Sequence, residues 1–205
     1  SNTPDFAARI DQESGAGRAQ RARDAGALLA VAQPEWSGLT TADARTIEAA
    51  HAVEVYNHGC AVGCDRPHGF YTLDQLLTEG RRLTLCATDD AHFSEPDHFG
   101  GWVMVKAEEN DPDALVEALK DGAFYASTGP EIRGVHWEED AVMVESSAVA
   151  AVVLQARGSA SHAVHGSSMT RTRVEYGRAA SSPWMRVTVV DAAGRRAWCN
   201  PHYRG

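Results

Sequence analysis

The chain has 205 residues, of which 43% are hydrophobic and 23% charged, and its formal net charge is −9. This length allows one or two globular domains with a sizeable core. The acidic balance argues against a nucleic-acid-binding protein, which needs a clustered basic surface, and no apolar run reaches transmembrane length. We therefore expect a cytoplasmic globular protein without a nucleic-acid or membrane partner.

Residues 1–130 alternate between predicted helices and strands. Helical patterns cover four segments. They are 18–25, a segment from a cap near Thr40 to Ala50, 73–79 with Thr72 as its cap, and a segment from Asp111 to Gly122. Apolar runs between them predict strands at 27–32, 52–56, 83–87, 101–107 and 124–127. Such alternation is typical of a mostly parallel α/β sheet or barrel.

The pattern changes after residue 130, where helical signals stop. Six short alternating runs predict the strands of a small antiparallel β-sandwich, at 132–137, 141–145, 149–156, 172–176, 184–190 and 196–199. The segment Asp191–Gly194 is a plausible hairpin turn, and the Gly- and Ser-rich stretch 158–168, with His162 and His165, predicts a loop. We place the boundary between two domains, 1–130 and 131–205, at this change.

Asp90 and His92 form an Asp-x-His pair directly after the predicted strand 83–87. If the backbone is still extended there, both side chains project to the same side and reach one cation. Oxygen and nitrogen ligands together suit Zn, Mn or Fe better than calcium, and a catalytic site would need further ligands. The alternative is that Asp90 caps a turn while His92 is a surface histidine.

Other polar residues follow the predicted strand 52–56, where α/β barrels place their chemistry. Glu54 and Asn57 border this strand and face the site or support it by hydrogen bonds, and His58 could touch substrate or act as a ligand. Asp97 and His98 lie on a loop that binds phosphate or, as we prefer, is simply solvated.

Four cysteines, Cys60, Cys64, Cys86 and Cys199, lack the spacing of a disulfide framework, so reduced thiols are the simplest interpretation. The segment 58–68 holds two of them together with His58 and His68 and could bind a structural zinc. Its Cys-x3-Cys spacing is not the tight Cys-x2-Cys knuckle, which favours the interpretation without zinc.

Several blocks in order resemble the later half of a PHP domain, the polymerase and histidinol phosphatase type of metal-dependent phosphoesterase. The blocks are Ala32-Gln-Pro-Glu-Trp36, Val53-Glu-Val-Tyr-Asn57, Leu73-Asp-Gln-Leu-Leu77, Ala87-Thr-Asp-Asp-Ala-His92 and Gly100-Gly-Trp-Val-Met-Val-Lys106. The continuation from Gly122 to Pro130 and from Asp191 to Pro201 is similar to the small β domain that follows the barrel in one branch of the family. The resemblance covers essentially the whole chain.

The resemblance implies a distorted (β/α)7 barrel whose strand ends bind two or three divalent metals, here partial and followed by the antiparallel β-sandwich. It also implies hydrolysis of a small-molecule phosphate ester by a metal-activated water. By the match, Asp90 and His92 correspond to the final Asp-x-His ligand pair of the family.

Two departures from the family bear on activity. The Asp-x-His-x-His strand that opens the family is absent from residues 1–205, and Gln33 stands where the family usually has a histidine ligand before proline. We therefore expect an incomplete chain, inactive alone, that self-associates or binds a missing N-terminal segment through its exposed sheet edge. The alternative is a catalytically degenerate relative that serves as a binding or interaction module.

Overall fold

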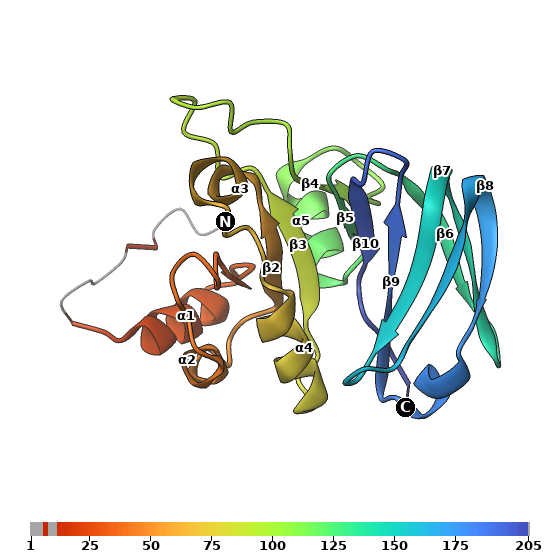
Figure 1. The fold of residues 1–205 in the computed structure, drawn as a ribbon. Coiled ribbons are helices and arrows are strands. Elements are labelled where there is room, and N and C mark those ends of the chain that lie inside the picture. The colour runs from red at the N-terminus through yellow and green to blue at the C-terminus, as the bar shows by residue number, and fades with distance from the viewer. Residues whose placement is uncertain (1–5, 8–11, 205) are drawn as a thin grey trace.

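The structure, a computed structural model, describes residues 6–7 and 12–204. It is a mixed α/β fold in which strands predominate. A small parallel sheet lies beside a larger, curled antiparallel sheet (Figure 1). No helix in the described part of the chain is both long and apolar enough to cross a membrane.

The parallel sheet has the strand order β1-β2-β3. Its strands are β1 (Ala30–Val31), β2 (Ala52–Asn57) and β3 (Thr84–Thr88). The helices of the fold are α1 (Gly15–Asp24), α2 (Thr41–Thr46), α3 (His58–Cys64), α4 (Phe70–Thr78) and α5 (Pro112–Lys120). Strand β2 is central and buried along nearly its whole length, as expected for a strand paired on both sides.

Local signals explain most helix ends. Helix α2 begins with a capping box in which Thr40 and Asp43 exchange hydrogen bonds, and Asp111 caps α5, whose first residue is Pro112. The expectation that Thr72 caps the next helix is wrong. Helix α4 begins three residues earlier, at Phe70 after Gly69, and has no side-chain cap. Tertiary packing of buried leucines on α4 replaces the missing cap.

Gly69 brings α4 close to β2. Its N–H donates to the carbonyl oxygen of Val55 at 3.1 Å. A Cβ atom at this position would collide with the carbonyl oxygen of Glu54, so only glycine fits. The start of α4 is therefore fixed against the end of β2.

The second sheet is antiparallel and contains eight strands. They are β4 (Trp102–Val105), β5 (Phe124–Ser127), β6 (Ile132–Trp137), β7 (Ala141–Ala156), β8 (Ser161–Glu175), β9 (Trp184–Val190), β10 (Arg196–Cys199) and β11 (His202–Tyr203), with the 3₁₀ helix η1 (Gly177–Ser181) after β8. The order is β4-β5-β10-β9-β7-β6, while β8 pairs with β7 and β11 with β9.

Three expectations about architecture need correction. The strands predicted at 101–107 and 124–127 exist as β4 and β5, but they pair antiparallel with each other, and β5 also with β10, instead of extending the parallel sheet. The described residues therefore contribute three parallel strands, and they do not form a (β/α)7 barrel. The small β-sandwich is a single curled sheet, because β7 pairs with β6 along its first half and with β9 along its second.

Strand β7 is continuous where two strands were predicted. Register shifts between Glu145 and Ala151 bend it, as bulges do, without ending it. The predicted loop at 158–168 is mostly the start of β8, so His162 and His165 lie in a strand that pairs with β7. The outward side chains of β8 are polar and small, so its sequence carries little hydrophobic signal.

Two hydrophobic clusters hold the fold together. One lies around the parallel sheet and α4, and the other fills the concave side of the curled sheet. Burying each large aliphatic side chain contributes about 1.5–3 kcal/mol. Trp184 and Trp198 come from the curled sheet but belong to the first cluster, so they join the two sheets. Tyr176, Trp184 and Trp198 are buried, while Trp137 is partly exposed.

Candidate functional site at the ends of the parallel strands

The carboxyl ends of β2 and β3 lie at one end of the molecule, beneath the loop 89–101 that follows β3 (Figure 1). Parallel strands end at the same edge of a sheet, so the polar residues after each strand come together there. Four predicted site residues meet at this edge. Gln33 comes from the turn after β1, Glu54 and Asn57 come from β2, and Asp90 comes from the loop after β3.

Glu54 is the buried centre of this group, with 5% of its surface exposed. Its carboxylate accepts hydrogen bonds from the backbone N–H of Gln33 at 2.7 Å, from Asn57 Nδ2 at 3.2 Å and from Thr88 Oγ1 at 2.5 Å. A buried carboxylate without a cation needs such donors to offset its lost hydration. Glu54 therefore ties the ends of all three parallel strands together.

One carboxylate oxygen of Asp90 accepts hydrogen bonds from two side-chain amides. Gln33 Nε2 and Asn57 Nδ2 both donate to Asp90 Oδ2, the second at 3.3 Å. Asn57 also uses its Oδ1 to accept from Cys60 N at 2.8 Å, which caps α3. Gln33 and Asp90 have φ values of 46° and 51°, a left-handed conformation that costs non-glycine residues energy and is often found at functional sites.

The pair Asp90 and His92 does not lie on an extended strand, because β3 ends at Thr88 and Asp90 is left-handed. Both side chains nevertheless line one cavity of about 430 Å³. The other residues that line it are Gln33, Trp36, Gly59, Cys60, Gly63, Cys64, Ser94, Glu95 and Asp97. The conformation of the loop after β3, and not the alternation of side chains along a strand, therefore brings both predicted ligands to the same cavity.

Two aspartates, Asp89 and Asp97, stabilise the conformation of the loop 89–101 through hydrogen bonds to its backbone. Asp97, expected to be solvated, is only 4% exposed and accepts from the N–H groups of His92 at 2.7 Å and Phe93 at 3.2 Å. The N–H of His92, with smaller contributions from its neighbours, lowers the pKa of Asp97 below its ordinary value. The imidazole of His92 stays mostly exposed, with its Nδ1 at 3.8 Å from Asp97 Oδ2.

Asp89 closes the far end of the loop by accepting three backbone N–H groups, from Phe99 at 2.6 Å, Gly100 at 2.8 Å and Gly101 at 2.8 Å. Burial opposes ionisation of Asp89, but these donors outweigh it and its pKa is lowered. Sequence reasoning missed the roles of Asp89 and Asp97. The signal was present in the sequence itself, because Asp89 and Asp97 flank a short segment that contains Ser94 and Pro96, residue types common in turns.

His58 does not line the cavity. It is the first residue of α3, and its Nδ1 lies 3.1 Å from the hydroxyl oxygen of Tyr56. Its ring packs so closely on Gly100 that a Cβ atom there would collide with it. His58 thus packs against the loop 89–101 at Gly100. The first seven residues of the segment 58–68 form the helix α3.

The two cysteines of α3, Cys60 and Cys64, also line the cavity. Cys64 Sγ donates to the carbonyl oxygen of Cys60 at 3.3 Å, and burial raises the pKa of the Cys60 thiol to about 11. Within residues 6–7 and 12–204, no three side chains of His, Cys, Asp or Glu come together in a metal-binding cluster.

A catalytic zinc site uses three protein ligands. Asp90 and His92 line the cavity together with Cys60, Cys64, Glu95 and Asp97, but no three of these side chains are arranged as a metal-binding group. No protein family model, no curated protein and no solved structure matches this chain. The geometry of the cavity and its hydrogen bonds must therefore carry any functional assignment.

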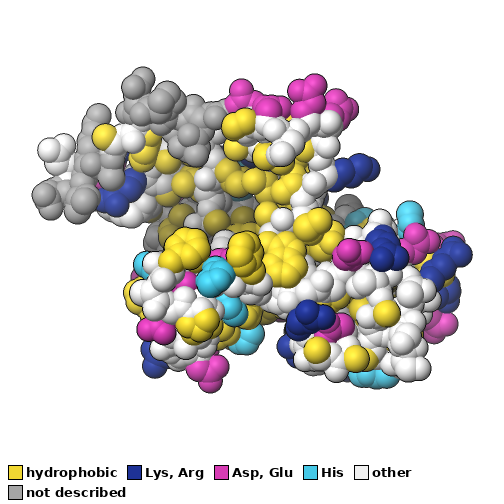
Figure 2. Space-filling model, turned by 90° about the horizontal axis from the view of Figure 1, so that it is seen from above, with side chains coloured by type: hydrophobic (Ala, Val, Ile, Leu, Met, Phe, Trp, Pro, Cys, Tyr) yellow, Lys and Arg dark blue, Asp and Glu magenta, His cyan; other side chains and the backbone are white. Residues whose placement is uncertain are grey.

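The surface at this end of the molecule is partly apolar. Figure 2 shows hydrophobic side chains across the middle of this face, with acidic side chains at one border and Lys and Arg mostly toward the curled sheet. The large apolar side chains exposed in the described residues include Trp36 beside the cavity and Phe93 and Phe99 on the loop. Exposed aromatic groups around a polar cavity are typical of a surface that contacts another molecule.

Proposed function

We propose that this chain is the later part of a PHP-type metal-dependent phosphoesterase, a hydrolase of small phosphate esters. In this proposal Asp90 and His92 are two ligands of a Zn, Mn or Fe ion. The remaining ligands come from polypeptide outside residues 1–205. The observation that supports it best is that Asp90 and His92 line one cavity at the carboxyl ends of parallel strands.

The surrounding hydrogen bonds suit this role. Asn57 is fixed at both ends, by Glu54 and Asp90 on its nitrogen and by the N–H of Cys60 on its oxygen. It orients the Asp90 carboxylate, and Asp90 Oδ1 accepts no hydrogen bond from the described residues, which leaves it open to a ligand. Such supporting hydrogen bonds are what holds a metal-binding carboxylate in place.

One observation favours a different function. The amide of Gln33 donates to Asp90 Oδ2 from the position where the family usually has a histidine ligand. An amide N–H cannot bind a metal, and it competes with one for the carboxylate oxygen. The second candidate is therefore a catalytically degenerate PHP-like protein in which the cavity serves as a binding or interaction module.

Metal content and hydrolysis separate the two candidates. The test uses a polypeptide that carries residues 1–205 together with the natural sequence that precedes them. We expect it to retain stoichiometric Zn, Mn or Fe by elemental analysis and to hydrolyse p-nitrophenyl phosphate. Asp90→Ala should lower turnover at least 100-fold and lower the metal content, because a carboxylate ligand is lost.

The matched control is Asp113→Ala, which removes an exposed carboxylate from the first turn of α5. It should leave metal content and turnover unchanged. A polypeptide that is both metal-free and inactive would favour the binding module instead. Activity that is indifferent to Asp90→Ala would contradict the assignment of Asp90 as a metal ligand. Phosphatase activity of residues 1–205 alone would contradict the claim that further ligands are needed.

A further inference from the structure

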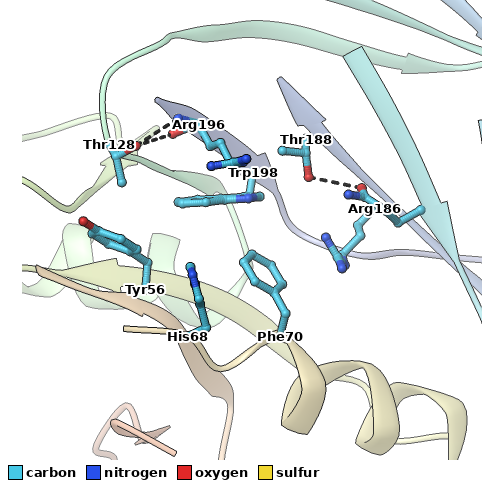
Figure 3. Close-up of a pocket in the computed structure, with 9 residues that line it drawn as sticks. Tyr56, His68, Phe70, Thr128, Arg186, Thr188, Arg196 and Trp198 are labelled. Atoms are coloured by element: carbon cyan, nitrogen blue, oxygen red, sulfur yellow. Dashed lines mark hydrogen bonds between the residues drawn. The ribbon is translucent and has the colours of Figure 1, made fainter. Parts of the chain in front are cut away.

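A second cavity, of about 500 Å³, lies between the two sheets and takes no part in the site around Asp90. On one side it is lined by Tyr56 at the end of β2 and by His68 and Phe70 at the start of α4. On the other it is lined by side chains of β9 and β10, among them Arg186 and Trp198 (Figure 3).

Arg186 is a charged group built into the wall of this cavity, with 5% of its surface exposed. Its Nε and Nη2 donate to the two carboxylate oxygens of Asp74 at 3.1 and 2.9 Å, and its guanidinium lies 4.5 Å from the centre of the Phe70 ring. The third nitrogen, Nη1, donates to no described residue and is not completely enclosed. A fixed guanidinium with a spare donor is well suited to bind an anion.

Two more donors line the same cavity. The Thr188 hydroxyl donates to Gln155 Oε1 at 3.1 Å, which orients the amide and leaves Nε2 as a donor without a described partner. Arg196 donates from Nη1 to the carbonyl oxygen of Gly194 and forms no ion pair with a described carboxylate. No acidic residue lines the cavity within the described part of the chain. The polar wall is therefore rich in donors and carries an unneutralised positive charge.

The cavity also has aromatic walls. The ring of Trp198 lies 5.5 Å from that of Phe70 and 6.1 Å from that of Tyr56, centre to centre. Figure 3 shows Trp198 beside Arg196 and Thr188, facing Tyr56, His68 and Phe70. Rings held in this way offer flat apolar area to another ring at low entropic cost.

We propose that this cavity binds a small organic anion composed of one flat ring and one carboxylate or phosphate group. The ring lies against Phe70, Tyr56 and Trp198. The anionic oxygens accept hydrogen bonds from Arg196, Gln155 and the free nitrogen of Arg186. The volume is within the range of small-molecule sites, which combine apolar walls with a few fixed polar groups.

Calorimetric titration of residues 1–205 tests this binding with benzoate and phenylphosphonate, neither of which has a phosphate ester bond to hydrolyse. Both should bind saturably, and acetate, methylphosphonate and benzyl alcohol should bind at least tenfold more weakly, since each lacks the ring or the charge. Arg196→Gln should weaken benzoate binding at least tenfold, and Phe70→Leu should weaken benzoate more than acetate. Both positions are partly or fully exposed, so the fold should tolerate these changes.

Arg195→Gln is the matched control. It removes the same charge one residue away, from a side chain that pairs with Asp191 and does not line the cavity. It should change benzoate affinity less than twofold, and Asp90→Ala should not change it. Absence of saturable binding of both ring-bearing probes, an equal loss in Arg195→Gln, or acetate binding as tight as benzoate would overturn the proposal. None of these results depends on metal or on phosphatase activity.

Discussion

Arg186 on β9 and Asp74 on α4 form a two-point ion pair across the junction of the two sheets, at 3.1 and 2.9 Å. The arginine side chain is 6% exposed and the aspartate side chain 32% exposed. Together with Trp184 and Trp198, this pair fixes how the curled sheet sits on the parallel one.

Breaking this pair from the aspartate side should destabilise the fold. Asp74→Ala leaves the Arg186 guanidinium buried without a counter-ion, and we expect a loss of about 3 kcal/mol in the free energy of unfolding, since removing one partner of a buried pair is costly. Urea unfolding monitored by fluorescence measures it. Asp24→Ala, at the exposed end of α1, is the control and should change stability by less than about 0.5 kcal/mol.

Gln33→His should improve metal binding at the first cavity. The substitution replaces an amide that donates to Asp90 with an imidazole that can ligate a metal beside it. We expect at least a tenfold tighter Zn²⁺ affinity by competition titration with a chromophoric chelator. The gain should vanish in the Gln33→His, Asp90→Ala double variant, and equal affinities of the single variant and the unaltered chain would refute the assignment of this position.

The loop 89–101 should lose its support in acid. The pKa of Asp89 is lowered in the folded state, so its contribution to stability is complete above the unfolded value of about 3.9 and is lost as pH falls through the lower, folded value. Asp89→Ala removes the acceptor of three N–H groups and should cost about 1–3 kcal/mol at pH 7. The stability difference between Asp89→Ala and the unaltered chain should shrink toward pH 3, whereas that for Asp113→Ala should not.

The cysteines should differ sharply in reactivity. Burial raises the pKa of Cys60 and of Cys199 to about 11, so roughly one thiol in a thousand is ionised at pH 8, while Cys64 is exposed. Iodoacetamide at pH 8 should therefore modify Cys64 first, as peptide mass spectrometry can show. Equal labelling of Cys199 in the folded chain would contradict the packing of β9 on β10.

The chain should self-associate. Strand β1 is the end strand of the parallel sheet, and Phe93 and Phe99 are 77% and 85% exposed on the neighbouring loop. We expect dimers or larger species at tens of micromolar in sedimentation velocity, because a free edge and an apolar surface favour association. The Phe93→Ser, Phe99→Ser variant should shift the equilibrium toward monomer, and Tyr71→Ser, which removes an exposed ring from α4, should not. A clean monomer of the unaltered chain would refute this prediction.

Local patterns predicted individual elements better than their assembly. The strands 132–137, 184–190 and 196–199 have the predicted bounds, because their alternation and the turn at Asp191–Gly194 are local signals. Strands β4 and β5 were also found by their apolar runs. The antiparallel pairing of β5 with β10 joins residues some 70 positions apart, which no local pattern encodes.

The same distinction applies to the site. Gln33, Glu54, Asn57 and Asp90 come together because they follow parallel strands, which chain order predicts. Helix α3 was missed because it is short and contains two glycines, although Asn57 is a good N-cap. The aromatic cavity could not be predicted, since Tyr56 and Trp198 meet there only through packing of one sheet on the other.

Gly69 has a consequence for both cavities. Gly69 directly precedes Phe70, which lines the aromatic cavity, and it packs against the backbone carbonyl of Glu54, which anchors the polar network. Gly69→Ala would push the start of α4 away from β2, because the added methyl group would overlap this carbonyl. Since Glu54 and Phe70 lie on either side of the contact, one methyl group should disturb both cavities at once.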